Sequence, residues 1–428
     1  MQSMNTIAFD PAEPLAALGA LPEQAAVFAL YGEDAKAEPY VGRTPNLRSR
    51  LKRLLTPSAK HPKRLQLAGR VRRIAWRRTG SEFESLLAQF SLLGEVFGGE
   101  KALERMHLGA PVFVRYMGGN RHPRLAVTTR PGQRESGWAY GPFASRVAAD
   151  RLVDETLKLF LLRRCVEDLE PNPQHPGCVY SEMKMCLAPC FGGCTDERYE
   201  EEAEAVERFL TTRGESRLKE LRAERDRASE ALEFEQAAAA HALVQRVESV
   251  AALAPELVRP LNQLRSIVLQ ASAQPGEVAV FLYDEGRLRG PVGFSTLGMR
   301  IQNEQSGSSS LFAQPVALEA VPEEQGTGLQ GDEEAERREQ SAGKKERPKV
   351  VRGMLEARLD EVLQALAAEA GAESSTARQG HLALLKRWYY RPEVKRAGEV
   401  YFPAEDGEWP VKAILRGIGR VAARALGA

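Results

Sequence analysis

All five cysteines of the 428-residue chain lie between Cys165 and Cys194, and four of them follow the pattern C-x12-C-x7-C-x3-C. These four are Cys165, Cys178, Cys186 and Cys190. Thiolates gathered in one segment can ligate a metal ion or a cluster. Zinc sites usually use closely paired hooks, whereas iron–sulfur clusters accept wider spacings, so the pattern favours a cluster and leaves zinc as the alternative.

The sequence has no signal-peptide core and no apolar run long enough to cross a bilayer, so we expect a cytoplasmic protein. Thiols stay reduced in that compartment, which disfavours a disulfide framework. Cys194 follows Cys190 closely and is either an alternative ligand or a small buried hydrophobe. We take it as the spare thiol.

Charge is distributed unevenly along the chain. The formal net charge is only +1, yet the stretch from Arg43 to Arg78 carries thirteen Lys and Arg and no Asp or Glu. The region after Thr195 is instead rich in Glu. A basic block of this size is typical of a protein that binds a phosphate backbone, and the alternative is a solvated helix face.

The N-terminal pattern predicts the order strand, strand, helix, strand, helix. Two short apolar runs, at 25–31 and 39–42, are joined by a polar turn and predict a β-hairpin. Leucines at helical spacing after Asn46 predict a basic amphipathic helix. A third strand is expected at 71–76 and a second helix at 81–93.

Several of these residues resemble a known family. Tyr40-Val41-Gly42-Arg43, with Arg50 further along, resembles the second half of the GIY-YIG nuclease motif of UvrC and Cho, the excinuclease subunits of bacterial nucleotide-excision repair. The stretches 140–143 and 161–165, the cysteine-rich region and a UVR-like stretch at 228–250 follow in the family's order. The resemblance implies a DNA endonuclease, a [4Fe-4S] cluster on the four cysteines, and docking on a UvrB-like helicase subunit.

The resemblance also implies roles for single residues. Tyr40 would orient or deprotonate the attacking water, and Arg50 would stabilise the charge on the phosphate. Arg43 stands where the family often has a lysine. The basic helix would contact DNA through Arg48, Lys52 and Arg53.

Two departures from the family motif concern catalysis. Phe28 aligns with the first motif tyrosine and lacks its hydroxyl, while Gln89 aligns with the metal-binding glutamate. A neutral amide is a poor ligand for Mg2+ or Mn2+. Glu82 stands about 10 Å along the same helix and cannot readily replace the glutamate. We therefore expect hydrolysis to be weak or absent.

The region 199–252 predicts helices with a UVR-like hairpin. The partner-binding residues expected there are Leu232, Phe234, Glu235 and Ala238. The alternative is a helical hairpin with no such partner.

The last part of the chain carries weaker signals. Strands at 267–269 and 278–283 with a turn at 284–286 predict a β-rich segment, without the carboxylate set of the RNase H-like nuclease of full-length UvrC. The cluster Arg387–Arg391 is either a base-stacking site or core packing. Gly417-Ile418-Gly419 resembles a helix-hairpin-helix, or lies in a plain amphipathic helix.

The predicted fold class is α+β and multidomain, with a small GIY-YIG α/β domain built on a short antiparallel sheet and a mixed α+β C-terminal region. The predicted divisions are an N-terminal lead (1–24), a GIY-YIG-like nuclease domain (25–100), a connecting α+β segment (101–160), a cysteine-rich cluster region (161–198), a helical region with a UVR motif (199–252), a β-rich segment (253–320), a disordered linker (321–350) and a C-terminal helical segment (351–428).

Three functions remain open at this point. The first is a UvrC/Cho-like endonuclease that binds damaged DNA and incises one strand together with UvrB. The second is a catalytically impaired adaptor that binds DNA and UvrB. The third is a cluster-based redox sensor or structural adaptor.

Overall fold

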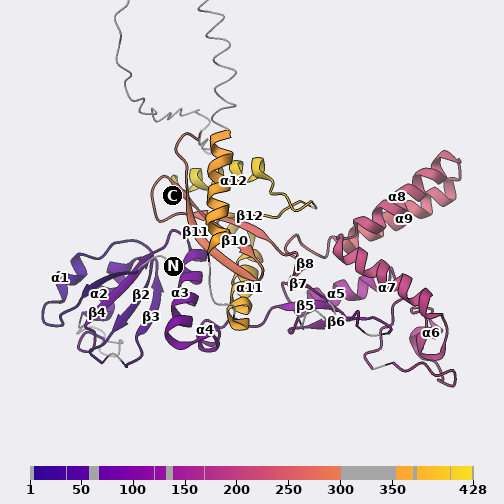
Figure 1. Ribbon diagram of the computed structural model, residues 1–428, viewed down its shortest axis with the longest axis horizontal. Coiled ribbons are helices and arrows are strands. Elements are labelled where there is room, and N and C mark those ends of the chain that lie inside the picture. The colour runs from indigo at the N-terminus through magenta and orange to yellow at the C-terminus, as the bar shows by residue number, and fades with distance from the viewer. Residues whose placement is uncertain are drawn as a thin grey trace, which may run out of the picture.

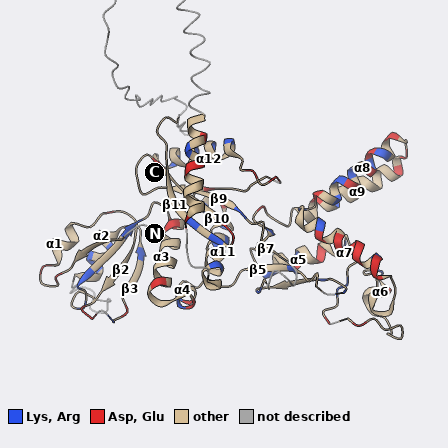
Figure 2. Ribbon diagram, in the orientation of Figure 1, with Lys and Arg blue, Asp and Glu red and all other residues tan. Residues whose placement is uncertain are grey.

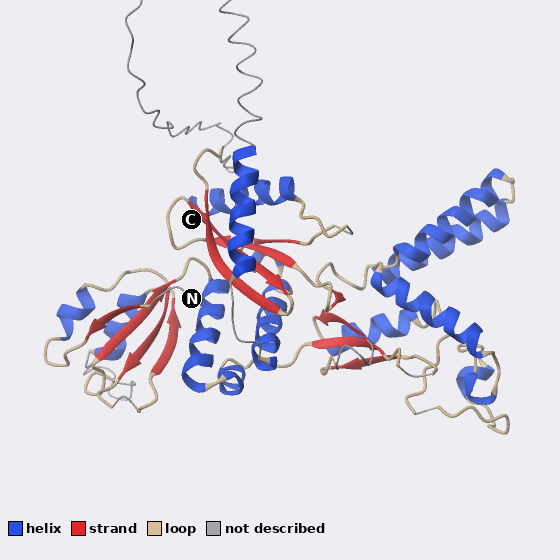
Figure 3. Ribbon diagram, viewed as in Figure 1, coloured by secondary structure: helices blue, strands red, loops and turns tan. Residues whose placement is uncertain are grey.

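The computed structural model describes residues 4–34, 36–56, 67–119, 121–131, 138–167, 169–299, 353–369, 374–404 and 406–426. The linker predicted at 321–350 lies outside these residues. The described chain is mixed α+β, with three small antiparallel sheets and helices packed around them (Figures 1 and 3). The predicted α+β class is confirmed.

The N-terminal unit is built on a sheet with the strand order β1-β4-β2-β3. Its strands are β1 (Asn5–Ala8), β2 (Ala26–Tyr31), β3 (Tyr40–Thr44) and β4 (Arg73–Arg78). Its helices are α1 (Pro14–Gly19), α2 (Leu47–Leu55), α3 (Glu82–Phe97) and α4 (Gly99–Arg105). Helices α1 and α2 cover one face of the sheet, and α3 covers the other.

The predicted order of strands and helices from β2 to α3 is confirmed, and local chemistry explains where the helices begin. The Asn46 side chain accepts a hydrogen bond from the Ser49 backbone N–H at the start of α2, and Ser81 does the same for Glu84 in α3. Strand β1 and helix α1 were not expected within the lead. Strand β1 is a short edge strand with mostly exposed side chains, so its sequence shows no alternation of apolar and polar residues.

The middle unit has a second sheet, with the order β6-β5-β7-β8. Its strands are β5 (Val112–Tyr116), β6 (Leu125–Thr128), β7 (Trp138–Phe143) and the two-residue β8 (Arg259–Pro260). Its helices are α5 (Arg146–Thr156), α6 (Val179–Glu182), the 3-10 turn η2 (Pro189–Phe191), α7 (Asp196–Thr211), α8 (Glu215–Glu230) and α9 (Phe234–Ala251). Helices α8 and α9 form a hairpin that projects away from the sheets (Figure 1).

The C-terminal unit has a third sheet, with the order β11-β10-β9-β12. Its strands are β9 (Ser266–Ala271), β10 (Glu277–Asp284), β11 (Arg287–Ser295) and β12 (Glu399–Tyr401), and all the pairings are antiparallel. Helix α11 (Ser375–Tyr389) lies on one face of this sheet. Helix α12 (Val411–Leu426) and a helix at 353–368 lie on the other. The predicted strands and the turn at 284–286 are confirmed.

The two ambiguous C-terminal patterns have structural roles. Trp388 is only 3% exposed and its Nε1–H donates to the Ala397 carbonyl, so the core-packing alternative is confirmed and base stacking on this ring is excluded. Gly417, Ile418 and Gly419 lie inside the uninterrupted helix α12. A helix-hairpin-helix would need a loop there, so that interpretation is wrong and the amphipathic-helix alternative is correct.

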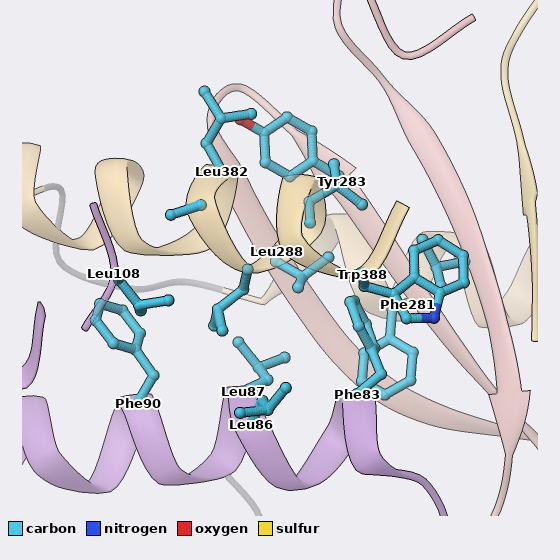
Figure 4. Close-up of a cluster of buried hydrophobic side chains, with 14 of the residues drawn as sticks. Phe83, Leu86, Leu87, Phe90, Leu108, Phe281, Tyr283, Leu288, Leu382 and Trp388 are labelled. Carbon is cyan, nitrogen blue, oxygen red and sulfur yellow. The ribbon is translucent and has the colours of Figure 1, made fainter. Parts of the chain in front are cut away.

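Helix α3 buries apolar side chains on two sides. Ala88 and Leu92 pack against the N-terminal sheet. On the other side, five residues pack against β10 and α11 (Figure 4). They are Phe83, Leu86, Leu87, Phe90 and Leu93. The N-terminal and C-terminal units therefore share one core.

The contact between α3 and α11 is close enough to be tested with glycine substitutions. A Cβ added at Gly380 of α11 would lie 2.0 Å from Cζ of Phe90, whereas one added at Gly94 of α3 meets no atom within 4 Å. We expect Gly380→Ala to lower the free energy of unfolding by about 1–3 kcal/mol through overpacking. The matched variant Gly94→Ala should raise it by about 0.5–1 kcal/mol, because alanine favours the helix.

Urea unfolding followed by circular dichroism would measure both changes. Equal effects of the two substitutions would contradict a close contact between α3 and α11.

Candidate functional site

Two aromatic residues predicted to be at the active site meet on the N-terminal sheet. Phe28 of β2 pairs with Gly42 of β3, and Leu30 pairs with Tyr40. The rings of Phe28 and Tyr40 lie on the same face, with their centroids 6.1 Å apart. Phe28 is fully buried, while Tyr40 is half-buried.

Gly42 is required by this packing. A Cβ at position 42 would lie 2.9 Å from Cζ of Phe28, so only glycine leaves room for the ring over the β3 backbone. The glycine of the Tyr-Val-Gly motif therefore has a packing role in this chain. Phe28 supplies an aromatic ring next to Tyr40 but no hydroxyl.

The basic helix α2 lies on the same face as these rings. Arg50 is half-buried there, and its guanidinium forms no hydrogen bond or ion pair with another described residue. Arg48 is already bound within the protein, because its Nε donates to the Leu21 carbonyl and its Nη1 lies 2.6 Å from Oε1 of Glu23. Lys52 and Arg53 are exposed in the last turn of α2.

Gln89 is on a different side of the sheet. It lies on α3, whose Ala88 packs on the face opposite to α2, and it forms no hydrogen bond with Tyr40 or Arg50 in the part of the chain that the structure describes. Since β3 is the edge strand, a substrate in contact with both Tyr40 and Gln89 would have to lie across that edge.

Arg43 points toward the α3 side of the same edge strand. Its Nη1 lies 3.6 Å from Oε1 of Glu82, at the first turn of α3. Glu82 also accepts two hydrogen bonds from Arg391, at 2.8 and 3.0 Å. These bonds lower the pKa of Glu82 below its ordinary value, although burial opposes the shift. The sequence marked Arg391 only as the end of an aromatic and basic cluster, and gave no signal of its pairing with Glu82, 309 positions away.

The four predicted ligand cysteines come from one folded segment. Cys178 caps α6 and Cys190 lies in η2, and the Asn172 N–H donates to the Cys190 carbonyl at 2.8 Å. Backbone N–H and arginine groups point at the sulfurs: the Ala188 N–H lies 3.4 Å from Sγ of Cys186. Nη1 of Arg163 lies 3.6 Å from Sγ of Cys165.

The thiols of this segment influence one another electrostatically. Burial raises the pKa of the Cys186 thiol, and Cys178, Cys190 and Cys165 each raise it further. The other three thiols therefore lie within electrostatic range of Cys186. Burial also raises the pKa of Cys194, and the Asp196 carboxylate and the Cys186 and Cys190 thiols raise it further, so Cys194 is coupled to the same group.

The described residues contain no group of three or more His, Cys, Asp or Glu side chains positioned as a finished metal site. The donor set nevertheless suits a thiolate-ligated metal centre. Four neighbouring thiols repel one another as thiolates, which a bound cation would relieve, and N–H groups already face two of the sulfurs.

The α8–α9 hairpin exposes apolar side chains at its tip. Leu232 and Phe234 are 70% and 68% exposed, and Glu235 and Ala238 are exposed beside them. The base of the hairpin is instead packed into the middle unit through Leu221 and other residues of α8 and α9.

Comparisons with known proteins show which family part of this chain resembles. Residues 113–209 match the family model of the UvrC/Cho excinuclease middle domain, which runs here from β5 into α7 and contains all five cysteines. Two similar curated proteins are named UvrABC system protein C. The one from Ectopseudomonas mendocina is 30% identical over 54% of this chain and 37% of its own length; that from Ruminiclostridium cellulolyticum is 27% identical over 68% and 47%.

The chain is therefore similar to the UvrC/Cho excinucleases over part of its length. It spans 31% to 47% of the length of the curated UvrC relatives it matches. No solved structure matches it.

Among the described helices of this UvrC-like chain, none has the length and apolar character needed to span a membrane. Figure 2 shows basic segments along the strands of its N-terminal unit and acidic segments along α7.

Proposed function

We propose that this UvrC-like chain is a DNA-repair protein of nucleotide-excision repair, which binds DNA through its N-terminal unit and a UvrB-like helicase subunit through its helical hairpin. The observation that carries the proposal is Arg50, which lies on α2, the helix that covers the sheet face carrying the Phe28–Tyr40 ring pair, and has no partner among the described residues. A planar guanidinium that is not bound within the protein suits a phosphate oxygen. Lys52 and Arg53 extend the same basic helix toward solvent.

This site has some of the functional groups of a GIY-YIG nuclease and lacks others. Tyr40 retains a hydroxyl that orients water, and Arg50 stabilises charge on the phosphate. Phe28 supplies no second hydroxyl, and Gln89 supplies no carboxylate for Mg2+ or Mn2+. Binding of DNA is therefore retained while hydrolysis is weak or absent.

An incision assay on a lesion-bearing duplex tests this assignment. With a UvrB-like partner and Mg2+ or Mn2+, the wild-type chain should bind DNA in a salt-dependent manner and cut it slowly or not at all. The double variant Phe28→Tyr, Gln89→Glu should cut faster, because it regains a hydroxyl and a metal ligand. Tyr40→Phe in the double variant should reverse the gain.

Efficient cutting by the wild type would contradict the impaired-site proposal and favour the endonuclease. DNA binding that does not weaken as salt is raised would instead favour the third alternative, a cluster-based redox sensor or structural adaptor.

The hairpin supports the second half of the proposal. Leu232 and Phe234 are exposed apolar groups with Glu233 and Glu235 around them, the arrangement of an anchor within a polar rim. A partner that covers these two side chains removes apolar surface from water. The hairpin tip is therefore proposed as the docking point for the UvrB-like subunit.

Phe234→Ser should weaken binding of a purified UvrB-like subunit at least tenfold, because anchor residues carry most of the energy of an interface. Leu15→Ser is the matched control, since Leu15 is similarly exposed, at 67%, on helix α1. Surface plasmon resonance would measure both. Equal losses in the two variants would exclude the hairpin tip as the docking point.

We also propose that Cys165, Cys178, Cys186 and Cys190 hold a [4Fe-4S] cluster, with zinc as the alternative. When bound, the metal centre would cross-link the loops between the middle sheet and α7. The backbone of this segment contributes by directing the Ala188 N–H at Sγ of Cys186 and by hydrogen bonds that join Leu187 to Leu161 and Asn172 to Cys190. The centre would thus order the connection between the sheet and the hairpin.

Metal analysis of anaerobically purified protein tests this set. Iron and labile sulfide are expected in the wild type and in Cys194→Ser, and should be lost from Cys186→Ser. Stoichiometric zinc without iron would establish the alternative ion. Equal metal loss in both variants would overturn the choice of Cys194 as the spare thiol.

A further inference from the structure

Three arginines from two distant parts of the chain gather around one carboxylate. Glu82 pairs with Arg43 of β3 at 3.6 Å and with Arg391, just after α11, at 2.8 Å. Arg387 lies in the last turn of α11, four residues before Arg391, and its charge also lowers the pKa of Glu82. One negative charge therefore faces three positive ones, and the group carries a net charge of about +2.

A buried aromatic contact fixes this arrangement. The ring of Phe83 lies 5.3 Å from the ring of Trp388, centroid to centroid, and both side chains are 3% exposed (Figure 4). Glu82 precedes Phe83 and Arg387 precedes Trp388, so the contact holds the charged neighbours together at the surface. The positions of the arginines thus follow from the shared core, and their long side chains need little further ordering.

Stability of the fold does not account for three arginines here. The Arg391–Glu82 pair already uses both carboxylate oxygens, and exposed ion pairs contribute little to stability. Arg387 is exposed and forms no hydrogen bond with a described residue. Three cations held close together repel one another unless an anion joins them.

The position of the cluster indicates the anion. Arg43 lies on β3, the edge strand that also carries Tyr40 on its other face. The edge strand is therefore flanked by positive charge on its α3 side.

We propose that Arg43, Arg387 and Arg391 form a binding site for the phosphate backbone of a DNA strand that passes over the edge strand β3. This inference rests on the proposed DNA binding of the N-terminal unit and extends it to the C-terminal unit, which supplies two of the three cations. Glu82 orients the guanidinium groups and competes with the phosphate for them.

Equilibrium binding of the full chain to a fluorescein-labelled duplex at several salt concentrations tests the site. Arg387→Gln should weaken binding and make the slope of log K against log salt shallower by about one, since one phosphate contact is lost. Arg416→Gln is the matched control, because Arg416 is exposed on α12, on the opposite face of the C-terminal sheet. It should leave the slope unchanged. An unchanged slope for Arg387→Gln would overturn the inference.

A second pair of variants separates a binding site from a structural ion pair. Glu82→Gln frees the arginines and should tighten DNA binding several-fold more than Glu361→Gln, which makes the same charge change on the helix at 353–368. A site with only a structural role would show equal effects for the two variants.

The outcomes also separate this inference from the proposed function. If the wild type shows no salt-dependent DNA binding, the proposed function fails. If Arg53→Gln weakens binding while Arg387→Gln does not, DNA binding by α2 stands and only the arginine cluster is excluded.

Discussion

Helix α3 is apolar on two sides, and water must be excluded from both. Its Leu92 side is covered by the N-terminal sheet, while its Phe83 and Phe90 side is covered by β10 and α11. Because burial of apolar area is the dominant favourable contribution to folding, the two units cannot separate without exposing this helix. The rest of the molecule is arranged around that constraint.

The shared core decides what surrounds the candidate nuclease site. It sets the end of α11 beside the start of α3, which brings Arg391 to Glu82 and thereby to Arg43 of the edge strand. It also sets Gln89 on the side of the sheet opposite to Arg50. The N-terminal sheet is thus one wall of a larger structure.

The middle unit anchors the cysteine segment in a different way, through buried polar groups. Tyr199 of α7 is fully buried, its hydroxyl donates to the Pro123 carbonyl, and it accepts from the Arg163 N–H. The Arg163 guanidinium in turn donates to the carbonyls of His122 and Glu167. A buried polar group that loses its hydrogen-bond partner costs free energy, so this network holds the loop beside Cys165 in one conformation.

The sequence by itself determined the features that depend on neighbours along the chain. Leucine spacing and the caps at Asn46 and Ser81 gave α2 and α3, because helix hydrogen bonds and capping are local. All the cysteines lie in one segment of the sequence, which marks them as a set. The sequence also predicts the missing hydroxyl at Phe28 and the missing carboxylate at Gln89, since each is a change of functional group.

Only the tertiary structure decided which surfaces are covered. Strand β1 exists because β4 offers it backbone partners, and Trp388 is buried because α3 lies beside it. An aromatic and basic run has the same sequence whether its rings face a core or a nucleic acid. The pairing of Glu82 with Arg391 spans 309 positions, and contacts at such separations depend on packing that no local pattern encodes.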